Sequence, residues 1–182
     1  MNIKETVGTT FDIFIKEPKK FVIATLIALL VTVVTLGILA PVMWLGMGEM
    51  FRKTKAGGIT SYDDLFIHLD KAIILAVMSF VVFICIAIGT VMLLVPGVII
   101  ATIWMYSTYY MVDNNTGILA SLKSSAFTVN KNNLMNHIVV VICIWLIMAI
   151  GTKIVIGILV AYPLCAGFMT LLFDEEKEKQ LI

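Results

Sequence analysis

The sequence predicts an all-α integral membrane protein: six transmembrane helices as three hairpins, with short amphipathic interfacial helices on the cytoplasmic side. The first observation behind this fold class is composition. Of the 182 residues, 60% are hydrophobic and 14% are charged, and the mean hydropathy is +1.04. A soluble domain of this size has too little interior to cover so much apolar surface. The excess is therefore expected to face lipid, which excludes soluble enzymes, nucleic-acid-binding proteins and disordered regulators.

The second observation is the length of the apolar runs. Within a single membrane domain covering 1–182, three runs cover residues 21–51, 72–112 and 137–173. As single helices they would be about 46, 61 and 55 Å long, whereas a bilayer core of about 30 Å needs about 20 residues. Each run is therefore expected to fold as a helical hairpin. The first run is the shortest, so its second helix, 41–51, is expected to continue past Glu49 and Arg52 into the headgroup layer.

Each run also contains glycine or proline near its middle, where a hairpin needs a turn. These residues are Gly37 with Pro41, then Pro96-Gly97, then Gly151 to Gly157 around Lys153.

The third observation is the placement of charge. Three hairpins put twelve of the thirteen Lys and Arg residues, and every Asp and Glu, on one side of the membrane. The cluster Arg52-Lys53-Thr54-Lys55 beside a span marks that side as cytoplasmic. Lys153 is expected in the outer headgroup layer, because a mid-bilayer lysine would cost about 2.5–3.5 kcal/mol or more. We expect a cytoplasmic (plasma) membrane protein of a bacterium or archaeon, with both termini cytoplasmic.

Three polar segments, 4–17, 61–71 and 116–131, are expected to be amphipathic helices at the inner interface. Ser61 and Asp64 have the spacing of a capping box. The apolar faces consist of Val7, Phe11 and Phe14; of Leu65, Phe66 and Leu69; and of Ile118, Leu119, Leu122, Ala126 and Val129. An interfacial helix followed by a hairpin thus recurs with a period of about 56 residues.

Few side chains in the spans could carry function. Glu49 is either an interfacial acid paired with Arg52 or Lys53, or part of an inward-facing cavity, because a charge in a span is costly and is retained for use. The aromatic group Trp104, Tyr106, Tyr109 and Tyr110 either anchors the protein at the interface or lines a lipid or substrate groove.

Small residues at helical spacing are expected to pack helices within the bundle or across a dimer. They are Gly157, Ala161 and Cys165, and Ala72, Ala76 and Ser79. The sequence contains no H-E-x-x-H motif, and His68 and His137 lie on different interfacial segments. We therefore predict no enzyme activity, no cofactor and no metal site.

A family resemblance begins at residue 95. The sequence there reads Val95-Pro96-Gly97-Val98-Ile99-Ile100, followed by the aromatic group, Asp113-Asn114, Ala120-Ser121-Leu122-Lys123-Ser124, Asn130-Lys131-Asn132 and Pro163. The stretch 46–69, with Arg52-Lys53 and Asp63-Asp64-Leu65-Phe66, adds to it. These features resemble a family of uncharacterised bacterial and archaeal integral membrane proteins related to the membrane domain of glycerophosphoryl diester phosphodiesterases. The resemblance implies a shared membrane fold. It implies no phosphodiesterase chemistry, because the chain has no counterpart of the soluble catalytic domain.

Three functions stay open at this point. The first is a non-enzymatic membrane protein that organises lipid or binds a partner protein through its cytoplasmic-face helices. The alternative is a small exporter or permease acting as a homo-oligomer, with Glu49, Thr90 and Tyr106 lining its path. A further alternative is an immunity-type protein against a membrane-active peptide. The expected partners are the lipid bilayer, further copies of the chain or another membrane protein, and no nucleic acid.

Overall fold

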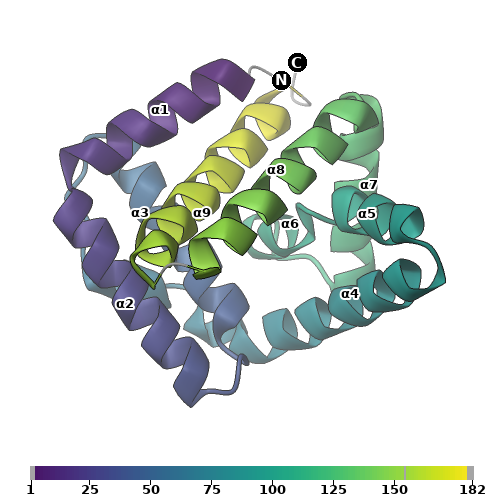
Figure 1. Cartoon of the computed structure of the whole chain (residues 1–182), viewed down its shortest axis with the longest axis horizontal. Coiled ribbons are helices and arrows are strands. Elements are labelled where there is room, and N and C mark those ends of the chain that lie inside the picture. The colour runs from purple at the N-terminus through teal and green to yellow at the C-terminus, as the bar shows by residue number, and fades with distance from the viewer. Residues whose placement is uncertain (1–2, 154, 180–182) are drawn as a thin grey trace. The chain divides into compact units, whose positions relative to one another are not determined.

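The computed structural model describes residues 3–153 and 155–179, and in these ranges the chain is helical and contains no strand (Figure 1). The α-helices are α1 (Ile3–Lys16), α2 (Pro18–Val34), α3 (Ala40–Lys55), α4 (Ala72–Met92), α5 (Leu94–Ile103), α6 (Ser107–Asp113), α7 (Ile118–Lys131), α8 (Leu134–Lys153) and α9 (Val155–Glu178). Two short 3₁₀ helices, η1 (Tyr62–Phe66) and η2 (Leu69–Lys71), precede α4.

Four helical segments of the described chain are long and apolar enough to cross a membrane. They are Tyr62–Met92, Val95–Asp113, Leu134–Lys153 and Gly157–Glu178. The all-helical class and its membrane compatibility are thereby confirmed. The helices α2 and α3 have 17 and 16 residues, or about 26 and 24 Å, which is shorter than a bilayer core. Six crossings, rather than four, stay a prediction.

One compact unit consists of residues 1–72 and 147–182. In it, α1, α2 and α3 all pack against α9 (Figure 1). The helices α3 and α9 approach closely at glycines: a Cβ on Gly167 would lie 2.5 Å from the Phe51 ring, and one on Gly48 would overlap the Thr170 hydroxyl. The ring of Phe51 also packs on Phe21, with centroids 4.4 Å apart.

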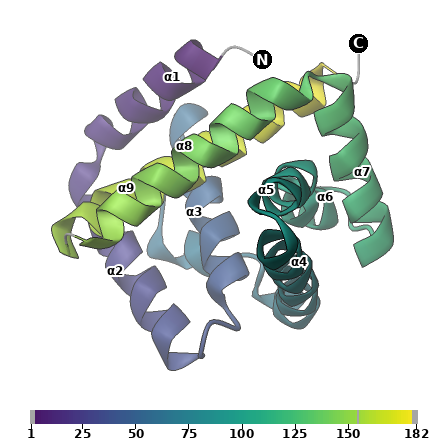
Figure 2. The same ribbon diagram turned by 45° about the vertical axis from the view of Figure 1, so that its right-hand side comes forward.

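The turn between α2 and α3 lies where the sequence predicts it (Figure 2). Gly37 has a φ of +86°, a conformation open to glycine, and its N–H donates to the Thr32 carbonyl at 2.8 Å. Pro41 falls in the first turn of α3, where a missing N–H costs nothing. The predicted role of Gly37 and Pro41 is confirmed.

The turn in the second apolar run differs from expectation. The helix breaks at Leu93, three residues before the predicted Pro96-Gly97. Pro96 instead occupies the first turn of α5, and Gly97 lets α5 approach α4, since a Cβ there would lie 2.8 Å from the Thr90 nitrogen. The helix α8 ends at Lys153 and α9 begins at Val155, both within the predicted stretch Gly151 to Gly157, and residue 154 lies outside the described residues. There a Cβ on Gly151 would lie 2.9 Å from that of Ala161.

The second unit, residues 73–146, contains α4 to α7 and the first part of α8. Its segment Val95–Asp113 is not one continuous helix, because residues 104–106 form a turn between α5 and α6. The helix α7 packs along α6 and α5.

The predicted segment 61–71 does not form one amphipathic helix. It folds as η1 and η2, which leave Leu69 about half exposed while Leu65 is fully buried. The predicted capping box is confirmed: the Asp64 carboxylate accepts from the Ser61 N–H at 2.9 Å, and the Ser61 hydroxyl accepts from the Asp63 N–H at 3.3 Å. The capping box therefore sets where η1 begins, although the helix that follows it is a 3₁₀ helix and not an α-helix.

Candidate membrane-interface site

An arginine joins the last turns of α3 and α9. The Arg52 guanidinium donates from Nε to Asp174 Oδ2 at 3.0 Å and from a terminal nitrogen to Oδ1 at 2.5 Å. Its other terminal nitrogen donates to Glu49 Oε1 at 2.5 Å. All three side chains are at most 29% exposed. The bidentate geometry fixes the two helices at one level, which a lysine in place of Arg52 could not do.

Two further contacts surround this pair within the same unit. His68 Nε2 lies 3.6 Å from Glu49 Oε1, and Lys53 pairs with Asp64, the buried capping residue of η1. The pairing of Glu49 with Arg52, one of the two predicted alternatives, is therefore present. Sequence spacing could find this pair at i, i+3, but not Asp174, which is 122 positions away from Arg52.

The junction of α1 and α2 is tied to the segment before η1. Lys20 pairs with Glu17 at 2.7 Å and donates to the Thr60 hydroxyl at 3.1 Å, which itself bonds to Glu17 at 3.1 Å. The hydrogen bond from Lys20 lowers the pKa of Glu17, desolvation opposes this, and the Thr60 hydroxyl lowers the pKa further. Glu17 is thus held in its charged form beside Lys20.

The surface of helix α1 divides into three sectors around the helix axis. One sector packs inside the unit and consists of Thr6, Thr10, Ile13 and Phe14. A second consists of Val7, Phe11 and Ile15, which are 51%, 51% and 55% exposed and lie within about 80° of one another around the helix, with the exposed Lys4 at the N-terminal end of the same sector. The third consists of the exposed charged residues Glu5, Asp12 and Lys16. A helix in contact with protein, lipid and water at once has this arrangement.

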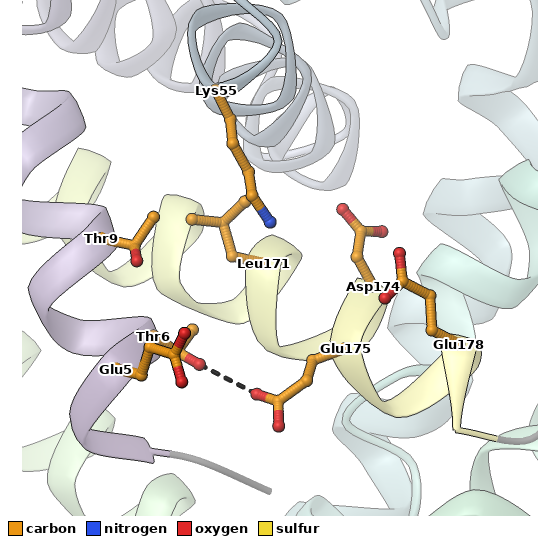
Figure 3. A pocket seen from close by; sticks show the side chains of 8 residues that line it. All are labelled: Glu5, Thr6, Thr9, Lys55, Leu171, Asp174, Glu175 and Glu178. Atoms are coloured by element: carbon orange, nitrogen blue, oxygen red, sulfur yellow. Dashed lines mark hydrogen bonds between the residues drawn. The ribbon is translucent and has the colours of Figure 1, made fainter.

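A cavity of about 190 Å³ lies between α1, α3 and α9 (Figure 3). It is lined by Glu5, Thr6, Thr9, Lys55, Leu171, Asp174, Glu175 and Glu178. The Thr6 hydroxyl donates to Glu175 at 3.0 Å across it, and Lys179 pairs with the same carboxylate at 2.5 Å. The lining is polar, and Glu49 is not part of it. Among the described residues no three His, Cys, Asp or Glu side chains are grouped to hold a metal ion.

In the second unit, hydroxyl groups close the break in the segment Val95–Asp113. The Ser125 hydroxyl donates to the Ile103 carbonyl at 2.7 Å and accepts from the Tyr106 N–H at 3.2 Å. In a continuous helix these two backbone groups would bond to other backbone groups of the same helix, and the turn at 104–106 prevents those bonds. Broken helices persist in a membrane only where such groups are satisfied by protein or water. Ser125 of α7 supplies the hydrogen bonds that these two backbone groups need.

The predicted aromatic group lies beside this break. Tyr106, Tyr109 and Tyr110 are buried, with at most 4% exposure, and Trp104 is half-buried. The Tyr110 hydroxyl hydrogen-bonds to that of Thr128 at 2.6 Å, and the Tyr106 ring meets the His137 ring edge-on at 5.7 Å. The three tyrosines therefore pack inside the protein rather than forming an exposed belt.

The remaining predicted residues are spread over both units. Thr90 is exposed near the end of α4, and its hydroxyl donates to the Ile86 carbonyl at 2.8 Å. On α9, Ala161 and Cys165 are buried and Gly157 is half-buried. On α4, Ala72, Ala76 and Ser79 are half-buried. Glu49 belongs to the first unit, whereas Thr90 and Tyr106 belong to the second.

Sequence reasoning missed the hydroxyl face of α7. Its buried residues are Ser121, Ser125, Thr128 and Val129, whereas the predicted apolar face includes Leu119, which is 72% exposed. The spacing of Ser121, Ser125 and Thr128 at i, i+4, i+7 is the signal that could have found this face.

The fold and site define a class: a helical protein with four segments able to cross a membrane. Only 17% of the most apolar window of Tyr62–Met92 is buried within the protein, so a membrane is the environment that would cover the rest. Comparison of the chain with protein-family models, with curated proteins and with solved structures gives no match.

Proposed function

We propose that this chain is a non-enzymatic polytopic membrane protein that organises the surrounding lipid through helices held at its cytoplasmic face. The observation that carries the proposal is the three-sector arrangement of α1. Its apolar row of Val7, Phe11 and Ile15 is exposed, although the other side of the same helix packs on α9. A lipid surface is the environment that suits an apolar row flanked by charged residues.

The proposal includes the six-helix topology. The α2–α3, α4–α5 and α8–α9 segments then form three hairpins, with α1, the segment 56–71 and α7 on the cytoplasmic side. The Arg52–Asp174 pair supports this, because it puts the ends of α3 and α9 at one level, and Lys153 precedes the opposite end of α9 in the sequence. Membership of the family that the sequence resembles is part of the same proposal.

Spin labels on two adjacent residues of α1 test the lipid contact. In a chain with its three cysteines replaced by alanine, Phe11→Cys and Asp12→Cys each carry a nitroxide, and the protein is reconstituted in liposomes. We expect the label at 11 to be relaxed mainly by oxygen, which partitions into lipid, and the label at 12 mainly by a water-soluble nickel chelate. Equal accessibility of both labels to the nickel chelate would refute the proposal.

The organising role has its own readout. Spin-labelled lipids in the same liposomes report the fraction of lipid whose motion the protein restricts. We expect this fraction to fall when Val7, Phe11 and Ile15 are replaced together by serine, because the lipid-facing sector of α1 is then polar. An unchanged restricted fraction would show that α1 holds no lipid.

A second candidate function is favoured by one observation. The interrupted segment α5–α6 has the form of a discontinuous helix, which in transporters lines a substrate path. The second candidate function is therefore that of a small exporter or permease acting as a homo-oligomer. Glu49→Gln is expected to alter flux without changing expression, and unchanged flux would count against this function.

A further inference from the structure

The outward side of α7 combines apolar and basic side chains. The buried side of the helix is its hydroxyl face. The opposite side has Leu119 and Phe127 with 72% and 62% exposure, and Lys123 stands between them at helical spacing i, i+4, i+8. Lys131 lies one turn further on, and both lysines are exposed. We call Leu119, Lys123, Phe127 and Lys131 the α7 outer face.

The unit that contains this face has more basic than acidic residues. Residues 1–72 and 147–182 contain eleven basic and eleven acidic residues, and several form the pairs described above. Residues 73–146 contain Lys123 and Lys131 against one acidic residue, Asp113. No Asp or Glu occurs from 114 to 173 in the sequence. The α7 outer face therefore carries positive charge that an external anion could neutralise.

We propose that the α7 outer face binds anionic phospholipid headgroups of the bilayer in which the chain is embedded. Leu119 and Phe127 enter the boundary between headgroups and acyl chains, and the ammonium groups of Lys123 and Lys131 meet lipid phosphates. This inference rests on the proposed function, which puts α7 at the cytoplasmic surface.

The positive charge of the α7 outer face also favours anionic lipid over a second copy of the chain as its binding partner. A second copy of the chain, paired symmetrically through this face, would bring the same lysines together, and like charges repel. The two exposed sectors of α1 are a useful contrast, because they carry Lys4 and Lys16 together with Glu5 and Asp12. Anionic lipid is thus expected to prefer the α7 outer face to α1.

The test measures binding of fluorescent phosphatidylglycerol and phosphatidylcholine to the full chain in neutral detergent micelles. We expect the wild-type chain to bind phosphatidylglycerol more tightly. Replacing both lysines, as Lys123→Gln with Lys131→Gln, is expected to remove this preference, because each lysine near an anionic lipid accounts for about fivefold in affinity. The matched control, Lys4→Gln with Lys16→Gln, is expected to retain it.

Two results would overturn the inference: equal binding of the two lipids by the wild-type chain, or a preference that survives the loss of Lys123 and Lys131. The pair Lys123→Arg with Lys131→Arg keeps the charge and is expected to keep the preference, which separates loss of charge from loss of fold. The nitroxide pair at positions 11 and 12 gives an independent result. If it still reports lipid at Phe11 while no lipid preference is seen, the proposed function stands and this inference fails.

Discussion

At the scale of single residues, the first unit depends on positions that admit no side chain. Gly46 on α3 lies against the backbone of η1, where a Cβ would be 2.5 Å from the Leu65 Cα and 2.6 Å from its carbonyl carbon. Gly8 on α1 is also helical, yet a Cβ there would meet nothing within 4 Å. Replacing each glycine by alanine therefore measures a different effect: loss of close packing at Gly46, and gain of helix propensity at Gly8.

Gly46→Ala is expected to destabilise the protein by about 1–3 kcal/mol, because η1 must move away from α3. Gly8→Ala is expected to stabilise it by about 0.5–1 kcal/mol through helix propensity alone. Thermal unfolding of the purified protein in detergent, followed by circular dichroism, measures both. If Gly46→Ala raised the midpoint as Gly8→Ala does, the tight contact between α3 and η1 would be absent.

Residues also show where local sequence stops being informative. The pairing of Glu49 with Arg52 could be predicted from a spacing of three on one helix. Asp174 could not, since it reaches Arg52 only after α3 and α9 pack. For the same reason the sequence left two roles open for the aromatic group, interfacial anchor or groove lining. The burial of Tyr106, Tyr109 and Tyr110 depends on a partner helix that composition does not identify.

At the scale of elements, the break between α5 and α6 depends on α7. One hydroxyl, that of Ser125, bonds to both backbone groups that the break exposes. Its neighbour Ser124 is half-buried and lies about 100° from Ser125 around the helix axis. The two serines therefore allow a matched comparison on adjacent positions.

Ser125→Ala is expected to cost about 1–3 kcal/mol, because it leaves the Ile103 carbonyl and the Tyr106 N–H without their partner. Ser124→Ala is expected to change stability by less than about 0.5 kcal/mol. Amide hydrogen exchange adds a local readout: the Tyr106 amide is expected to exchange faster in Ser125→Ala and at the wild-type rate in Ser124→Ala. Unchanged Tyr106 exchange in Ser125→Ala would mean that the break is closed by other groups.

Elements were predictable where local chemistry decides them. Gly37 and Pro41 fixed one turn, and Ser61 with Asp64 fixed the start of η1. Pro96-Gly97 misplaced the next turn by three residues, because proline is tolerated in a first helical turn as readily as in a loop. The hydroxyl face of α7 could not be predicted, because the need for Ser125 arises only from the α5–α6 break.

At the scale of the whole molecule, composition determined the class. The excess of apolar residues is reflected in four segments able to span a membrane. Composition could not determine the number of crossings, since α2 and α3 are shorter than a bilayer core is thick. It also could not locate the exposed apolar sector of α1, because Phe14, predicted on the same apolar face as Val7 and Phe11, packs inward.

The central claim is that hairpins return the charged segments to one side of the membrane. Its most direct test uses single cysteines, Lys55→Cys, Asn115→Cys and Lys153→Cys, each in the cysteine-free chain in intact cells. A membrane-impermeant maleimide is expected to label position 153 from outside, and to label positions 55 and 115 only after the cells are opened. Labelling of position 55 from outside would contradict the three-hairpin topology.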